Sequence, residues 1–492
     1  MLAWTLYLTL LGAAVTLLAR GRSCRWPHRT ALVSSLAGLG ITVADLLRHT
    51  PGADPITLVR VPWIPYVGAE FHLAADGISV TLLLLTGIAA VAGVLFSWNV
   101  TDRPREYFTL YLILVAAVYG VFLSWDLLLF FVFYEMAIIP KYILIARWGS
   151  TRREYAAMKL ALYSFLGSAA VLVGLLAIGG ASGLETFDLS ALVRQGVPPH
   201  LQGWIFPLLF GGFAVLAGLW PFHTWAPTGH VAAPTAASML LAGVIMKLGA
   251  YGCLRVALPL LPTGALLWRP VFTVLAVTGI VWGALVALRQ RDFKFVIGYS
   301  SVSHMGFVLL GLAAATPMAL GGAVLQMFSH GVIAGLLFGT VGRMVYERTH
   351  TRDLDQLESM NLARSMPFVA GTFALAGLAS MGMPGFSGFI AELQVLLGTW
   401  PVSGPLVVAS GAGLVLGVAY TLRAIQLAFL GSEGRHAPVS AVAPITLAEK
   451  AGTALLLAST VLLGLFPRVV IDWINPVLAG RLFEGLRKGT GL

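Results

Sequence analysis

The feature of this sequence that most constrains its fold is a series of apolar runs, each near twenty residues long, that recur from one end of the chain to the other. About twenty apolar residues are what a helix needs to cross the hydrocarbon of a bilayer. Only 11% of the 492 residues are charged, whereas soluble proteins carry about 25%. The sequence therefore predicts an all-α polytopic membrane protein of about fourteen transmembrane helices, with no polar stretch long enough for a soluble domain.

The apolar runs divide the chain into four parts. Residues 1–106 carry helices 1–3, residues 107–257 helices 4–8, residues 270–430 helices 9–13, and residues 448–492 helix 14 and a tail. Met1–Ala19 lacks a basic leading region and a convincing cleavage site, so we expect a retained helix rather than a signal peptide. The expected spans are 2–19, 30–47, 76–96, 107–124, 126–146, 156–179, 203–222, 232–257, 270–288, 294–315, 319–346, 367–398, 405–430 and 448–466.

The placement of positive charge predicts the orientation in the membrane. The net charge of +10 does not indicate nucleic acid binding, because Lys and Arg lie mostly in short loops between the apolar runs. The odd-numbered loops carry eighteen of them, so the positive-inside rule places these loops in the cytoplasm of a bacterium and both termini on the outer, periplasmic side of the inner membrane. The eighteen are Arg20, Arg22, Arg25, Arg29, Arg103, Arg105, Arg147, Arg152, Arg153, Arg289, Arg291, Lys294, Arg343, Arg348, Arg352, Arg364, Arg435 and Lys450, and the even-numbered loops hold little beyond Arg48, Arg60, Arg194 and Arg269.

Two of the expected helices contain breaks. Helix 7 ends in residues 220–225 (Trp-Pro-Phe-His-Thr-Trp), and helix 12, overlong at 367–398, contains three glycines and a proline within residues 382–388. The breaks are five helices apart, and a repeated five-helix unit must be inverted in the membrane because it crosses an odd number of times. We therefore expect helices 4–8 and 9–13 to be inverted repeats, each with a broken helix, as in many ion transporters. The alternative is that Pro and Gly are simply tolerated in membrane helices.

Several ionisable side chains fall inside the expected spans, from helix 5 to helix 13. Each costs roughly 2.5–3.5 kcal/mol at the bilayer centre and is therefore a functional hypothesis by default. Burial and neighbouring charges shift the pKa of Glu, Lys and His through neutrality, so a line of such groups can load and release protons. The expected proton pathway consists of Glu135, Lys159, Lys247, His304, His330 and Glu392, with Arg423, His223 and His230 as accessory positions.

Most of these side chains also have a structural interpretation. Glu135 could be a protonated carboxyl that donates one hydrogen bond, although its central position favours a function. Lys159 is explained almost as well by snorkelling to the cytoplasmic surface, and for Lys141, near the inner end of helix 5, snorkelling is the favoured interpretation. Lys247 has too much apolar sequence on both sides to snorkel easily. A lone buried His is more often a satisfied core residue, and Arg423 can equally anchor a loop or helix end.

The chain shows no catalytic chemistry of its own. It contains no nucleophile–base pair, phosphate-binding loop or metal-ligand spacing, and its two cysteines, Cys24 and Cys253, form neither a metal pattern nor a disulfide framework. We therefore expect neither a cofactor nor a metal in this chain.

Three stretches resemble the antiporter-like membrane subunits of respiratory complex I, which are related to Mrp-type cation/proton antiporters. They are residues 131–136 (Phe-Val-Phe-Tyr-Glu-Met) with Pro140 following, residues 221–236, which run from Pro-Phe-His-Thr-Trp to His-Val-Ala-Ala-Pro-Thr-Ala, and residues 299–306 (Tyr-Ser-Ser-Val-Ser-His-Met-Gly). They match in order and spacing, and the resemblance covers nearly the whole chain. It is greatest to subunit M, the chain 4 type, because helix 12 carries Glu392 where the L and N types carry lysine.

The resemblance implies a role for each buried charge. Glu135 corresponds to the helix 5 glutamate, Lys247 to the central helix 8 lysine, and Glu392 to the exit-side residue, with His304 and His330 as the linking histidines. A small departure is Ala391, where the family usually has Gly before the glutamate.

A larger departure concerns helix 7. The family normally reads Phe-Ala-Val-Lys there, and that lysine partners the helix 5 glutamate, whereas this chain has Leu216. Lys141 lies six residues from Glu135, about 240° around a continuous helix, so we do not expect it to be the substitute. Either another group substitutes, or the uptake half-channel works differently, or this copy pumps poorly.

The function implied by the resemblance is that of a proton-translocating subunit of an NADH- or ferredoxin-linked quinone oxidoreductase. Flavin, iron–sulfur clusters and quinone would then belong to partner subunits, and the neighbours in the membrane would be L- and N-type antiporter-like subunits, small subunits and lipid, with no nucleic acid. Two alternatives remain: a subunit of a multi-subunit cation/proton antiporter, and a structural spacer that has lost pumping because of Leu216.

Overall fold

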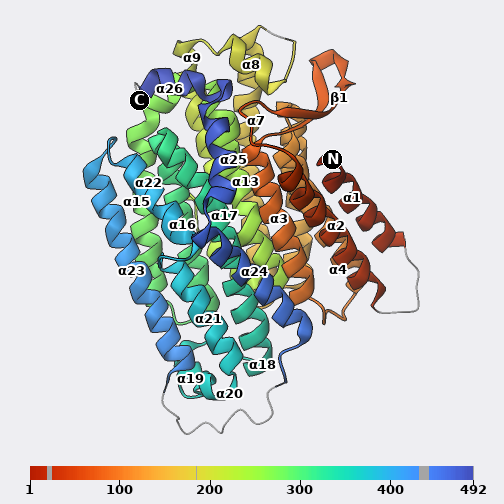
Figure 1. Cartoon of the computed structure of the whole chain (residues 1–492), viewed down its shortest axis with the longest axis vertical. Helices are drawn as coiled ribbons and strands as arrows, with labels where there is room; N and C mark the ends of the chain where they lie inside the picture. Colours follow the sequence, from red (N-terminus) through yellow and green to blue (C-terminus); the bar gives the residue numbers. More distant parts are fainter. Residues whose placement is uncertain (19–24, 184, 432–442, 491–492) are drawn as a thin grey trace.

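The computed structural model is a bundle of long helices that run roughly side by side (Figure 1). Twelve helices within the described ranges are long and apolar enough to cross a membrane, and Ala3–Leu18 and Pro367–Ser380 are shorter apolar helices. The prediction of an all-α, multi-pass membrane fold is confirmed, whereas the count of fourteen helices and the inverted repeats stay predictions. The structure describes residues 1–18, 25–183, 185–431 and 443–490, so that Arg20, Arg22, Cys24 and Arg435 lie outside the described residues.

The elements follow the four parts of the chain. The N-terminal part holds α1 (Ala3–Leu18), α2 (Trp26–Arg48), β1 (Ile56–Ile64), β2 (Ala69–Ala75) and α3 (Gly77–Phe96). The first five-helix unit holds α4 (Pro104–Leu123), α5 (Leu127–Met136), α6 (Ile138–Trp148), α7 (Arg153–Ser182), α8 (Leu189–Gln195), α9 (Pro199–Phe206), α10 (Gly212–Ala217), α11 (Trp225–Ala232), α12 (Thr235–Leu240), α13 (Met246–Gly252) and α14 (Leu258–Leu260). The second unit holds α15 (Pro262–Arg289), α16 (Phe293–Ala314), α17 (Pro317–Gly339), α18 (Glu347–Thr349), α19 (Leu354–Glu358), α20 (Leu362–Ser365), α21 (Pro367–Ser380), α22 (Ser387–Thr399) and α23 (Gly404–Phe429). The C-terminal part holds α24 (Leu447–Leu465), α25 (Arg468–Ala479) and α26 (Glu484–Thr490).

The helices that the sequence expected to be broken are broken. The helix 7 region ends at Ala217 and resumes as α11 at Trp225, and helix 12 is divided into α21 and α22 by residues 381–386. A further break, which the sequence analysis did not foresee, divides helix 5 at Ala137. Pro140 accounts for it physically, because proline has no N–H to donate to the carbonyl four residues earlier.

Two pairs of aspartates occupy matching places five helices apart. Asp126 caps α5 by accepting from the amides of Leu128 and Leu129, and it forms a β-bridge with Asp188. In the second unit, Asp292 caps α16 in the same way and forms a β-bridge with Asp353. An aspartate at the N-cap satisfies amides that the first turn of a helix leaves free. The same local device at both places supports the prediction of two inverted repeats.

A small polar cap, also missing from the sequence analysis, covers one end of the bundle. Strands β1 and β2 form an antiparallel hairpin beside α8, and the C-terminal helix α26 lies at the same end (Figure 1). Helices α19 and α20 lie at the opposite end (Figure 1). In the predicted orientation the hairpin end is the outer face.

Burial divides the bundle into a centre and a periphery. The segments Thr235–Leu260 and Pro317–Thr349 are enclosed along their whole apolar windows, whereas α23 and α2 leave most of theirs exposed. Exposed leucine, valine and phenylalanine side chains on the peripheral helices are what a lipid or partner-subunit surface requires. The enclosed segments are therefore where charged groups can be kept away from lipid.

Candidate functional site

Lys247 lies at the centre of the bundle, with 0% of its surface exposed. It is the second residue of α13 and follows a π-helical segment, Leu241–Ile245, of the kind that often occurs at functional positions. Its ammonium group donates one hydrogen bond to the carbonyl of Ala242 and another, of 2.8 Å, to Nδ1 of His330 on α17. The snorkelling alternative therefore does not apply to Lys247.

His330, His304 and Glu392 continue from Lys247 in one row. The rings of His330 and His304 have centroids 5.6 Å apart. Nδ1 of His304, on α16, lies 3.1 Å from Oε1 of Glu392 on α22, and Nε2 lies 3.1 Å from the hydroxyl of Ser380. All four members of the row are 0–8% exposed, so helices far apart in sequence bring four predicted site residues into one enclosed polar line.

The break in helix 12 is shaped around Glu392. Gln326 on α17 donates to Oε1 of Glu392 at 3.1 Å. Gly382, with φ of 71°, lies against the other carboxylate oxygen, since a Cβ there would be 2.7 Å from Oε2. Glycine is the residue that takes this backbone conformation without strain. The broken helix therefore holds Glu392 between a hydrogen-bond donor and a glycine-lined turn.

Glu135 forms a second, separate group with Lys141. Glu135 is partly buried, its Oε1 atom has no hydrogen-bond partner among the described residues, and the side chains that act on it electrostatically are Ser168 and Lys141. Lys141 is 1% exposed, and its ammonium group donates to the hydroxyl of Ser164 on α7 at 3.1 Å. The snorkelling interpretation of Lys141 is wrong: its head group lies inside the bundle because the break at Ala137 redirects the chain.

A region without charges separates the two groups. Helix α10 carries Leu216, which is 3% exposed, and packs against α13, where a Cβ on Gly249 would meet the backbone of Leu216 at 3.1 Å. On its other side α10 meets α7 at Gly167 and Gly212. The described residues contain no hydrogen-bonded link from Glu135 to Lys247. The departure at Leu216 therefore lies between the two halves of the predicted line.

The remaining predicted positions are more dispersed. Lys159 is partly exposed, with its ammonium group 5.9 Å from the centre of the Tyr155 ring, so both interpretations of it stay open. His223 is 3% exposed in the break of helix 7, and its Nδ1 atom has no partner among the described residues. Arg423 donates to the carbonyls of Leu288 and Gln290, at 2.8 and 3.0 Å. This contact at the end of α15 supports the anchor interpretation of Arg423.

His230 is enclosed between two lysines. It is 0% exposed, neither ring nitrogen has a hydrogen-bond partner among the described residues, and the charges of Lys247 and Lys294 both act on it. The sequence analysis counted Lys294 among the loop charges, but its side chain is 3% exposed and donates to the carbonyl of Ala233 at 3.4 Å. The signal that could have revealed it is its place directly after Asp292, the N-cap of a largely apolar helix.

A buried ion pair on the outer side of Lys247 was also missed. Arg255 and Asp76 are joined by two hydrogen bonds of 2.6 and 2.7 Å, and both side chains are 1% exposed. The Tyr251 hydroxyl accepts a further bond from Arg255 at 3.1 Å. Asp76 also accepts from the amide of Ser79 and so caps α3. This pair fixes α3 to the π-helical segment that contains Arg255.

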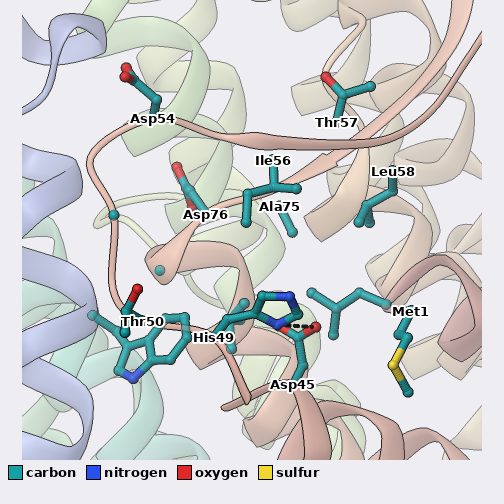
Figure 2. A pocket seen from close by; sticks show the side chains of 15 residues that line it. Met1, Asp45, His49, Thr50, Asp54, Ile56, Thr57, Leu58, Ala75 and Asp76 are labelled. Atoms are coloured by element: carbon teal, nitrogen blue, oxygen red, sulfur yellow. Dashed lines mark ion pairs between the residues drawn. The ribbon is translucent and has the colours of Figure 1, made fainter. Parts of the chain in front are cut away.

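A cavity of about 310 Å³ opens beside this ion pair on the outer face (Figure 2). Three carboxylates line it, those of Asp45, Asp54 and Asp76. Two of them are already paired, Asp76 with Arg255 and Asp45 with His49 at 3.1 Å. Because these charges are satisfied within the protein, we assign no ligand to this cavity.

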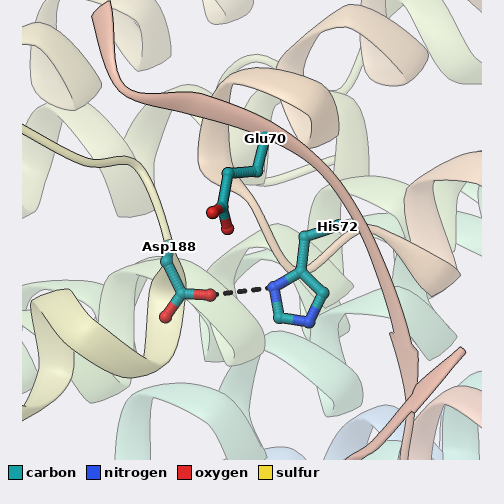
Figure 3. A group of neighbouring side chains, drawn as sticks. All are labelled: Glu70, His72 and Asp188. Carbon is teal, nitrogen blue, oxygen red and sulfur yellow. Dashed lines mark hydrogen bonds and ion pairs between the residues drawn. The ribbon is translucent and has the colours of Figure 1, made fainter. Parts of the chain in front are cut away.

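Three side chains of the outer cap have the spacing of a metal site. Ligand atoms of Glu70, His72 and Asp188 all lie within 4.8 Å of one another, and Figure 3 shows them converging from β2 and the start of α8. However, Arg60 already supplies the positive charge, 2.7 Å from Glu70 and 3.9 Å from Asp188. His72 donates from Nδ1 to Asp188 at 2.8 Å. The group therefore acts as an electrostatic tie between the hairpin and α8.

This tie predicts a pH-dependent contribution to stability. Burial opposes ionisation of Asp188, but hydrogen bonds from His72 and the Ala191 amide, with the charge of Arg60, hold its pKa below the ordinary value. A depressed pKa stabilises the fold above the unfolded value of about 3.9, and this contribution is lost as pH falls through the folded value. Asp188→Asn, which can still cap α8, is expected to cost about 1 kcal/mol at neutral pH.

Thermal unfolding of the purified protein across pH measures this effect. The difference between Asp188→Asn and the parent should shrink below about pH 4, and Asp54→Asn, at an exposed position of the same face, is the matched control. A difference that stays constant down to acid pH would contradict the assignment.

The row of buried charges between broken helices can now be compared with known proteins. Residues 124–417 match the family model described as NADH:quinone oxidoreductase/Mrp antiporter, TM. The chain belongs to this family. Its relatives include NADH-quinone oxidoreductase subunit M of Rhodobacter capsulatus, 36% identical over 474 residues, which cover 94% of this chain and 91% of that protein. NAD(P)H-quinone oxidoreductase chain 4 of a Synechococcus strain is 38% identical over 418 residues, which cover 83% and 79%.

Solved structures of the NADH:quinone oxidoreductase/Mrp antiporter family give the same result. A chain of respiratory complex I from Thermus thermophilus matches with a TM-score of 0.89 and 28% identity, over 98% of this chain and 100% of that one. A chain of the Mrp complex from Dietzia, at 21% identity and a TM-score of 0.85 over 99% and 98%, shares the fold. The predicted membership of the antiporter-like subunits, with subunit M and chain 4 as relatives, is therefore confirmed.

Proposed function

We propose that this chain translocates protons through the row Lys247, His330, His304 and Glu392 as a membrane subunit of an NADH- or ferredoxin-linked quinone oxidoreductase. The observation that carries the proposal is the 2.8 Å hydrogen bond between Lys247 and His330 inside the bundle, followed by the His304–Glu392 contact at 3.1 Å. Ionisable groups at membrane depth are costly. A chain of mutually bonded ones is better explained by proton transfer than by stability.

The geometry gives the transfer a direction. When Lys247 transfers its proton to Nδ1 of His330, the ring becomes doubly protonated, and the hydrogen on Nε2 is then the one to leave. That nitrogen has no partner among the described residues, so a water molecule or the neighbouring ring can accept its proton. His304 hands its own Nδ1 proton to Glu392. The carboxylate of Glu392 is thus the last titratable group of the row.

The outer end of the row lies near a cavity of about 390 Å³, lined by Gly321, Gln394 and Asn475, among others. Gln326, which donates to Glu392, lies five residues from Gly321 along α17, or about 7.5 Å along the helix axis. On this proposal the proton leaves Glu392 towards the cavity. At the cytoplasmic side, His230 and Lys294 lead to Lys247 and supply it with protons.

Electron transfer is assigned to partner subunits. They would hold the flavin, the iron–sulfur clusters and the quinone, and this chain would change state when their charges or conformations change. L- and N-type antiporter-like subunits and small subunits would lie beside it in a bacterial inner membrane, with both termini in the periplasm. The exposed apolar side chains of the peripheral helices suit such neighbours and lipid.

Glu392→Gln tests the proposal directly. Glutamine fits the same space but cannot take the proton from His304, so the ratio of protons moved to electrons transferred should fall by the contribution of this subunit. The measurement is quinone reduction coupled to internal acidification in vesicles that contain the purified assembly. Glu154→Gln, at an exposed position of α7, is the control. An unchanged ratio in the Glu392 variant would favour the structural spacer.

The cation/proton antiporter is the second candidate. It is favoured only by the shared fold of the Mrp complex. Vesicles that contain the chain with its native partners would separate the two: acidification driven by quinone reduction supports the oxidoreductase, and acidification driven by a sodium gradient alone supports the antiporter.

A further inference from the structure

Two opposite charges lie on either side of the break in helix 5. Glu135 is the second-last residue of α5, and Lys141 lies in the first turn of α6. On an unbroken helix six residues would turn these side chains about 240° apart. The turn at Ala137, which Pro140 enforces, removes that constraint.

Contacts with α7 show that both side chains face the same way. Lys141 donates to Ser164, and Ser168 is the hydroxyl that acts on Glu135. Ser164 and Ser168 are four residues apart within α7 and are each 3% exposed, so they lie on one face of that helix, one turn apart. Helix α7 runs antiparallel to α5 and α6, which matches Lys141 with the earlier serine and Glu135 with the later one.

Each of the two charges needs the other. A lysine that is 1% exposed loses nearly all of its hydration, and one hydroxyl does not replace it. Glu135 has one carboxylate oxygen without a partner in the described part of the chain. Leu216, on the neighbouring α10, offers no charge. An opposite charge a few ångströms away is the strongest remaining source of stabilisation for both groups.

We propose that Lys141 is the charge partner of Glu135, and that a proton passes between them along the face of α7 that carries Ser164 and Ser168. The carboxyl of Glu135 gives its proton up and becomes a carboxylate, and the amine of Lys141 takes a proton up and becomes an ammonium, with the hydroxyls as carriers. The inference rests on the proposed function for its purpose, since the pair would be the uptake-side element of that pump. Its electrostatic part stands without it.

The test measures the protonation of Glu135 spectroscopically. Infrared titration of the purified assembly follows the carboxyl band that Glu135→Gln removes. Lys141→Met should lower the ratio of ionised to protonated Glu135 at a given pH by at least about tenfold, because an adjacent cation has an effect of that size or more. Lys141→Arg should keep the parent titration, and Lys450→Met, at an exposed lysine, is the matched control.

A relocated charge provides the second arm. Leu216→Lys placed in the Lys141→Met background should restore both the titration of Glu135 and the proton-to-electron ratio. An unchanged band in Lys141→Met would overturn the inference even if the assembly still pumps. A shifted band in an assembly whose ratio never depended on Glu392 would instead keep the ion pair and overturn the pumping function.

Discussion

Replacing Lys247 with methionine is expected to stop proton translocation through this chain while the assembly stays intact. Methionine has a similar length but neither charge nor proton, so His330 loses its donor and the row is cut at its first member. Removal of a positioned proton-transfer group usually slows the step by 10²-fold or more, roughly. Methionine also removes the cost of a buried ammonium group, so folding is not expected to suffer.

The measurement is internal acidification during quinone reduction, with the amount of assembly normalised by its flavin content. Lys450→Met, the same change at an exposed position, should match the parent. If Lys247→Met pumps at the parent rate, then the Lys247–His330 contact has only a structural role, and the spacer interpretation is correct.

The second large effect is on stability and concerns Arg255. Changing it to methionine leaves Asp76 buried, 1% exposed and without its bidentate partner. Breaking such a pair on one side costs about 3–5 kcal/mol, because an uncompensated charge stays in a medium of low dielectric constant. We expect a marked fall in the thermal stability and the yield of the purified chain.

The double variant Arg255→Met/Asp76→Asn separates loss of the pair from loss of packing. Asparagine still accepts from the amide of Ser79 and caps α3 but carries no charge, so most of the stability should return. Arg194→Met, at an exposed arginine of the same face, is the control. Equal losses in the single and double variants would mean that packing around the guanidinium, rather than the charge of Asp76, determines the stability.

The paired aspartates strengthen the case for internal symmetry beyond the two broken helices. Asp126 with Asp188, and Asp292 with Asp353, form the same cap and bridge five helices apart. Because the second set lies at the opposite end of the bundle in the predicted orientation, the two units would be related by inversion. Neither pair stood out in the sequence, since an aspartate before an apolar run is a common way to begin a helix.

The sequence by itself determined the membrane fold, the breaks near residues 220 and 384, the family and most of the buried row. Apolar runs report spans because lipid offers no partner to a free backbone amide, so each crossing must be a whole helix. A charge inside such a run is visible without coordinates for the same reason. Lys247, His304, His330 and Glu392 were recognisable in this way.

Only the tertiary structure decided which of these groups touch. It joined Lys247 to His330 and His304 to Glu392 across helices far apart in sequence. It brought Lys141 into the bundle with Glu135, where the helical period alone had placed the two on different faces. Helical periodicity is a local rule that a single break at Ala137 cancels, and contacts between helices depend on packing that no local pattern contains.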